Sequence, residues 1–157
     1  DRHEETMAIT LREVAIDNFN DVVRLQPAPG QESFIAPNVL SIAQSKVAPN
    51  FVPLAIHNHG TVVGFLMFGQ DIETRRWHIV RLMIGEQYQR RGYAREALKQ
   101  LIAQLAQHPE CEEVYISYMP DNVAAERLYE SLGFRKTGEF DDAGEVVMRL
   151  ELPKLGI

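Results

Sequence analysis

The chain has 157 residues, of which 45% are hydrophobic and 24% charged, a composition typical of a globular domain that buries a core. Its formal net charge of −6 argues against a general nucleic-acid binder, and no apolar run approaches the length of a membrane span. The single cysteine, Cys111, excludes an internal disulfide and a Cys-based zinc cluster. We therefore expect a cytoplasmic protein without nucleic-acid or membrane partners.

The first third of the chain predicts a mixture of strand, helix and loop. Residues 1–6 are polar and patternless, so we expect a tag or disordered terminus there and a single domain over 7–157. Asn38 is expected to cap the second helix. In chain order a strand, a helix, a proline-rich loop and a second helix are predicted over 8–14, 17–26, 27–37 and 38–48.

The rest of the chain alternates strands and helices. The stretch "NHG" between two apolar runs is typical of a hairpin turn, and Gly133 of a helix C-terminus. The predicted elements are strands over 51–57, 61–71 and 76–84, a helix over 91–107, a strand over 112–119, a helix over 122–134, and a hairpin of 135–140 with 145–152. This order predicts an α/β (α+β) fold with a mixed, mostly antiparallel twisted sheet, flanked by helices and containing one parallel pair.

The helix that follows the 76–84 strand begins with "QRRGYA", residues 89–94. The positive end of a helix dipole disfavours two arginines unless an anion binds there. Gly92 lets a ligand approach the backbone closely, and Arg90 and Arg91 are placed to reach around a phosphate. On these residues alone, an anion site and a solvated charge run both fit the pattern.

A second segment, "NVAAERLYESLGF" at 122–134, begins thirty residues after Gly92 and follows the predicted crossover strand. Together the two segments resemble the GNAT superfamily of acetyl-coenzyme A-dependent N-acetyltransferases, over essentially residues 8 to 152. The resemblance implies the fold of that superfamily, with a splayed parallel pair at its centre. It also implies acetyl-CoA as co-substrate, a small-molecule amine as acceptor and no metal.

The same resemblance assigns roles to individual positions. Tyr129 would lie by the sulfur and protonate the departing thiolate, as a phenol can when it is aimed at the leaving group. Its alternative is a packing role on the apolar face of the helix. The implied cofactor-binding residues are Leu82, Met83, Ile84, Gln89, Arg90, Arg91, Gly92, Tyr93, Ala94, Arg95, Asn122 and Tyr129.

The general base and the acceptor are left open. Val80 stands where several polyamine-acetylating relatives have an acidic residue, so His78 and Glu32 are the candidates near the substrate. Histidine spacing does not support a metal site. The segments 31–44 and 134–152 resemble bacterial spermine/spermidine N-acetyltransferases, and a polycation would need spaced carboxylates such as Glu32 and Glu145. Those carboxylates fit solvated turns equally well.

Three functions follow from these patterns. The first is acetylation of a polyamine by direct transfer in a ternary complex. The second is acetylation of another amine, such as an aminoglycoside or a peptide N-terminus. The third is an acyl-CoA-binding sensor without turnover, against which Tyr129 argues. An exposed strand edge in this fold also leaves room for a homodimer.

Overall fold

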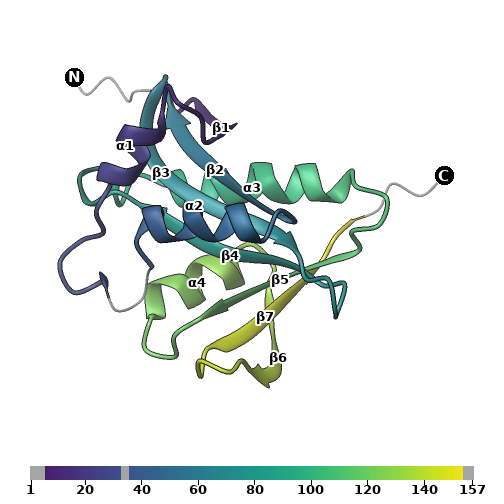
Figure 1. The fold of residues 1–157 in the computed structure, drawn as a ribbon. Coiled ribbons are helices and arrows are strands. Elements are labelled where there is room, and N and C mark those ends of the chain that lie inside the picture. The colour runs from purple at the N-terminus through teal and green to yellow at the C-terminus, as the bar shows by residue number, and fades with distance from the viewer. Residues whose placement is uncertain (1–5, 33–35, 154–157) are drawn as a thin grey trace.

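The computed structural model describes residues 6–32 and 36–153, which form a seven-stranded sheet with helices on both faces (Figure 1). The predicted elements are confirmed to within a few residues at each end. Their observed bounds are β1 (Ile9–Glu13), α1 (Phe19–Arg24), α2 (Asn38–Val47), β2 (Phe51–Asn58), β3 (Thr61–Gln70), β4 (Trp77–Ile84), the 3-10 helix η2 (Glu86–Tyr88), α3 (Tyr93–Ala106), β5 (Glu113–Tyr118), α4 (Val123–Ser131), β6 (Arg135–Phe140) and β7 (Val146–Glu151).

The strand order is β1-β2-β3-β4-β5-β7-β6. The central pair β4–β5 is parallel, and the other neighbouring pairs are antiparallel. A parallel pair needs a crossover connection, and α3 supplies it between these two strands. The predicted mixed, mostly antiparallel sheet with one parallel pair is confirmed.

Two apolar clusters cover the two faces of the sheet. Val22 of α1 and Ile42 of α2 pack with Phe65 and Met83 on one face. The larger cluster on the other face joins α3 and α4 to the sheet, with Leu98 and Leu101 fully buried. The helices are therefore held in place by burial of one apolar side each. Among the described residues, no helix is both long and apolar enough to span a membrane.

The parallel strands β4 and β5 separate after a short paired stretch. Their pairing runs from Trp77 opposite Val114 to Ile79 opposite Ile116 and stops there. On its other edge β4 has a bulge at the same place, because Met67 faces Arg81 while Phe68 faces Ile79, which leaves Val80 as the extra residue. A bulge bends its strand. Beyond Val80, β4 therefore keeps β3 as partner and leaves β5.

Two sequence-based expectations about helix ends are wrong. Asn38 does not cap α2, because Pro37 takes that position and the Asn38 side chain is buried, donating to the Val22 carbonyl at 2.9 Å. The helix expected from residue 91 begins at Tyr93, with Gly92 as its cap. Arg90 and Gly92 both have positive φ, of 65° and 82°, which a helix cannot contain. The two arginines precede the helix rather than open it.

Candidate active site

A groove of about 280 Å³ follows the end of β4, the start of α3 and one side of α4. Ten of the residues expected to bind the cofactor line it. They are Leu82, Met83, Ile84, Gln89, Arg90, Gly92, Tyr93, Ala94, Arg95 and Tyr129. The two sequence segments thus form opposite walls of one groove.

The start of α3 presents backbone N–H groups to this groove. Arg90 and Gly92, on either side of Arg91, have left-handed conformations, which occur in the backbone turns that bind anions. The first N–H groups of a helix also lack an acceptor within the helix. A Cβ built on Gly92 would meet only the Met7 side chain, at 3.5 Å, so the space before the cap is open. The geometry suits an anion such as a phosphate.

The loop before α2 is tied to the groove by two glutamines. Gln89 donates from Nε2 to the Ile84 carbonyl and to Oε1 of Gln31, both at 2.9 Å. Gln31 donates back to Gln89 Oε1 at 3.4 Å. The end of β4, the start of α3 and the loop are therefore fixed relative to one another. Gln31 lines the groove and was not expected from the sequence.

Tyr129 closes the groove from α4. Its side chain is 7% exposed, and its ring centroid lies 6.0 Å from those of Tyr118 and Phe134. Burial raises the pKa of the Tyr129 hydroxyl above its ordinary value, and the negative charge of Glu145 raises it further. The phenol therefore keeps its proton at physiological pH, as a proton donor must.

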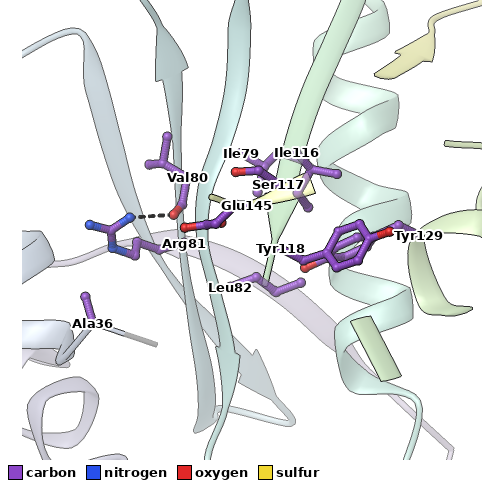
Figure 2. A pocket seen from close by; sticks show the side chains of 10 residues that line it. All are labelled: Ala36, Ile79, Val80, Arg81, Leu82, Ile116, Ser117, Tyr118, Tyr129 and Glu145. Carbon is purple, nitrogen blue, oxygen red and sulfur yellow. Dashed lines mark hydrogen bonds between the residues drawn. The ribbon is translucent and has the colours of Figure 1, made fainter. Parts of the chain in front are cut away.

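A second pocket, of about 360 Å³, lies beside the groove where β4 and β5 separate (Figure 2). Leu82 and Tyr129 line both cavities, so the groove and the pocket meet at these two side chains. The pocket is also lined by Ala36, Ile79, Val80, Arg81, Ile116, Ser117, Tyr118 and Glu145. We call the first cavity the donor groove and the second the acceptor pocket.

Two charged side chains of opposite sign line the acceptor pocket. Arg81 is held by neighbours: its Nη1 donates to the Val80 carbonyl at 2.7 Å, its Nε to Ser41 Oγ at 3.1 Å and its Nη2 to Gln44 Oε1 at 3.3 Å. Glu145 comes from the hairpin between β6 and β7. In Figure 2 its carboxylate lies between Arg81 on one side and the tyrosine rings on the other.

Four residues expected at the site lie outside these two linings. His78 packs on Tyr115 in the paired part of β4 and β5, with ring centroids 5.5 Å apart. Glu32 is exposed and accepts a hydrogen bond from the Gly30 N–H at 2.8 Å. Arg91 donates to the Gln87 carbonyl at 3.3 Å and lines a neighbouring cavity. Asn122 caps α4 by accepting from the Ala125 N–H at 3.2 Å.

Sequence reasoning missed part of both linings. In the donor groove these residues are Gln31, Tyr88, Ala124, Ala125 and Leu128. Ala125 lies four positions before Tyr129 and three before Leu128, so the helical period held the signal for these two residues. Nothing in the sequence signalled Gln31 or Arg81, which reach their cavities only through the tertiary fold. Within residues 6–32 and 36–153, no three His, Cys, Asp or Glu side chains gather as a metal site would require.

Comparison with known proteins agrees with this geometry. The model of the acetyltransferase (GNAT) family matches residues 19–134. Spermine/spermidine N(1)-acetyltransferase of Bacillus subtilis is 33% identical over 152 residues, which cover 93% of this chain and 100% of that protein. An N-alpha-acetyltransferase of Saccharolobus solfataricus is 25% identical, covering 81% of this chain and 80% of that one.

A solved structure shows the same fold. Spermidine N-acetyltransferase from Vibrio cholerae, in complex with CoA and spermine, superimposes with a TM-score of 0.72 at 15% identity, covering 92% of this chain and 95% of that one. The family match extends over most of the chain and includes both walls of the donor groove. The chain belongs to the GNAT family and is an acetyl-transferring enzyme.

Proposed function

We propose that this GNAT enzyme moves the acetyl group of acetyl-CoA directly to a primary amine in a ternary complex, with spermine or spermidine as the acceptor. The observation that carries the proposal is the meeting of two cavities at Leu82 and Tyr129. Donor and acceptor bound in these cavities would face each other at one point. Direct transfer then needs no covalent enzyme intermediate, and Cys111 is fully buried in the core, away from both linings.

The residues of the donor groove fit acetyl-CoA. Its pyrophosphate would bind the N–H groups at the start of α3, with the Arg90 and Arg95 side chains adding positive charge. The small side chains of Ala94 and Ala125 leave room for the pantetheine arm. The acetyl group would then lie by the Leu82–Ile84 backbone, where β4 has left β5.

Tyr129 would supply the proton for the departing sulfur. It is buried, keeps its proton, and lines both cavities at their junction. Protonation of a thiolate as it leaves avoids releasing a charge into an apolar site. A general acid in this position acts in the transition state, so its removal would lower turnover more than donor affinity.

The acceptor assignment rests on charge and on the relatives. Glu145 offers a carboxylate to an ammonium group inside the acceptor pocket. Two of the similar proteins are named for spermine or spermidine, and the Vibrio cholerae structure contains spermine. Glu32, an exposed acid outside the pocket lining, would add a second negative charge for a longer acceptor. A chain of ammonium groups fits such spaced carboxylates.

Arg81 favours a second candidate acceptor. A guanidinium held in the pocket by Ser41 and Gln44 repels a second ammonium and suits a carbonyl or carboxylate oxygen. A peptide with a free N-terminus offers an amine with such oxygens close behind it. The N-alpha-acetyltransferase among the relatives is named for this activity.

One assay separates these functions. Release of CoA thiol is followed with acetyl-CoA and a panel of spermidine, spermine, a monoamine of similar length, a short peptide and an aminoglycoside. We expect the highest kcat/KM with spermidine or spermine. The highest kcat/KM with the peptide would support the second candidate instead. Binding of acetyl-CoA without thiol release for any amine would contradict an amine acetyltransferase and support a sensor.

A further inference from the structure

An amine acceptor must lose a proton before it can attack, because primary amines are protonated at neutral pH. A general base in the acceptor pocket would remove that proton. The bulged residue of β4, which lines the pocket beside the point where the strands separate, is the apolar Val80. The base must therefore come from another element. This question presupposes the amine acetylation proposed above.

Glu145 is the carboxylate that lines the acceptor pocket among the described residues. It is half-buried, so its side chain is partly shielded from water yet reachable by a ligand in the pocket. Figure 2 shows its carboxylate next to Val80 and Arg81, with the tyrosine rings on the other side. Its charge acts on the Tyr129 hydroxyl, so the two groups lie within electrostatic reach of each other. A proton acceptor and a proton donor thus share one cavity.

The ionisable groups around Glu145 come from three other elements. Arg81 faces it from β4, Tyr118 from β5 and Tyr129 from α4. On its own hairpin the neighbouring acid is Asp141. Arg81 is the cation among these groups. A carboxylate placed among these side chains can reach an amine bound in the pocket.

Asp141 fixes the backbone of Glu145 from both sides. The Glu145 N–H donates to Asp141 Oδ1 at 2.8 Å, and the Asp141 N–H donates to the Glu145 carbonyl at 3.0 Å. The same Asp141 oxygen accepts from the Ala143 N–H at 3.0 Å. The Gly144 N–H closes the turn on the Asp141 carbonyl at 3.0 Å. The turn therefore sets where the Glu145 side chain leaves the hairpin.

We propose that Glu145 is the general base that deprotonates the acceptor amine, and that Asp141 is the positioning residue that aims it. The ammonium gives one proton to the Glu145 carboxylate. The freed nitrogen lone pair forms the bond to the acetyl carbon, the carbon–sulfur bond breaks, and sulfur takes the electron pair together with the Tyr129 proton. The second proton released by nitrogen returns to Tyr129, and Glu145 passes its proton to solvent.

The test compares Glu145→Gln with the parent on two acceptors at saturating concentrations. One acceptor is the best amine of the panel, and the other is its analogue with fluorines beside the reacting nitrogen, which is unprotonated at neutral pH. We expect kcat with the ordinary amine to fall about a hundredfold. With the fluorinated amine, kcat should stay near the parent value, because no proton has to be removed.

Asp141→Ala should lower kcat with the ordinary amine about tenfold and leave kcat with the fluorinated amine near the parent value. The effect is smaller because the Glu145 carboxylate is still present but less well aimed. Asp142→Ala is the matched control, an exposed acid on the same turn, and should leave both rates unchanged. The pH profile gives a second readout. In Glu145→Gln the rate with the ordinary amine should rise about tenfold per pH unit, following ionisation of the amine itself.

Two results would overturn the proposal. A raised KM with unchanged kcat would make Glu145 a binding group only. An equal fall in kcat with the ordinary and the fluorinated amine would make the role of Glu145 structural. A parent enzyme that releases no thiol with any amine would instead refute the proposed function, and the parent reactions are measured first to separate these failures.

Discussion

The donor groove and the acceptor pocket share Leu82 and Tyr129 but differ in what presents their polar groups. The donor groove is lined by the turn and first residues of α3, Arg90 and Gly92 to Arg95, and by small apolar side chains such as Ala125. In the acceptor pocket, the polar groups include the side chains of Arg81, Ser117 and Glu145, which come from three different strands or turns. One cavity is shaped by main-chain conformation, and the other by side chains that the fold brings together.

This difference determines how each cavity responds to change. A backbone surface keeps its hydrogen-bond donors when most side chains are replaced, so donor binding should depend on a few conformations such as that of Gly92. A surface of side chains changes its chemistry with each substitution, so acceptor choice and proton transfer should depend on single residues. The following predictions test that division, from the largest expected effect to the smallest.

Tyr129 lines both cavities, and replacing it should lower turnover far more than it lowers acetyl-CoA affinity. Tyr129→Phe keeps the ring contacts with Tyr118 and Phe134 and removes the hydroxyl. We expect kcat to fall about a hundredfold, because the departing sulfur loses its proton donor. The dissociation constant of acetyl-CoA, measured by calorimetry, should change little, since the N–H groups at α3 are untouched.

Tyr115→Phe is the control for that experiment. It removes a hydroxyl that donates to Glu113 at 3.0 Å, outside both cavities, and should leave kcat at the parent level. Parent turnover in folded Tyr129→Phe would make Tyr129 a packing residue. A large loss of donor affinity in the same variant would contradict the separation of the two roles.

Gly92 tests the backbone character of the donor groove. Gly92→Asp and Gly92→Asn carry similar strain at a φ of 82°, and only Asp places a negative charge before the helix. We expect acetyl-CoA to bind about tenfold more weakly to the Asp variant than to the Asn variant, because the carboxylate repels the pyrophosphate. Calorimetry on both variants measures the difference. Equal affinities would place the pyrophosphate elsewhere.

The same division explains what could be predicted from the sequence. The donor groove comes from short contiguous segments, so the resemblance of 89–95 and 122–134 to the GNAT superfamily implied most of its lining. Arg91 and Asn122 departed from that prediction because a left-handed turn and a cap hydrogen bond redirect their side chains.

The acceptor pocket was harder to predict because its lining residues lie far apart in the sequence. Glu145 was expected near the substrate only through a general argument about charge, and nothing distinguished it from the neighbouring acids of its hairpin. Arg81 was not expected at all, since a charged residue on a strand gives no sign of the cavity that it faces. The bulge at Val80, which opens the sheet there, appears only in the register with β3.

Glu32 tests whether acceptor recognition extends beyond the pocket itself. It is exposed, so its attraction for a second ammonium is screened by water and should be weak. We expect Glu32→Gln to raise KM for spermidine about two- to fivefold and to leave KM for a monoamine unchanged. Glu13→Gln, an exposed acid on β1, is the control and should change neither. Unchanged KM for spermidine in Glu32→Gln would confine recognition to the pocket.

The smallest effect concerns His78, which lies outside both cavities in the paired part of β4 and β5. Burial lowers the pKa of His78 below its ordinary value and Arg76 lowers it further, while the charge of Asp71 opposes both. The unfolded chain therefore takes up this proton at a higher pH than the folded chain does. The contribution of His78 to stability is complete above the unfolded pKa of about 6.5 and is lost as pH falls toward the lower folded value.

We therefore expect the melting temperature to fall modestly as pH drops from 7 through this window, and His78→Gln to remove that part of the slope. His59→Asn, a histidine of the exposed β2–β3 turn with a φ of 49°, should keep the slope, since asparagine tolerates that conformation.

The His78→Gln variant also tests whether His78 contacts the acceptor. Because His78 packs on Tyr115 where the strands are still paired, its protonation should weaken that pairing without adding a charge to the acceptor pocket. KM for the acceptor should then be the same in His78→Gln and in the parent. A KM that rises in the variant would place His78 in contact with the amine and extend the side-chain surface along β4 beyond the pocket.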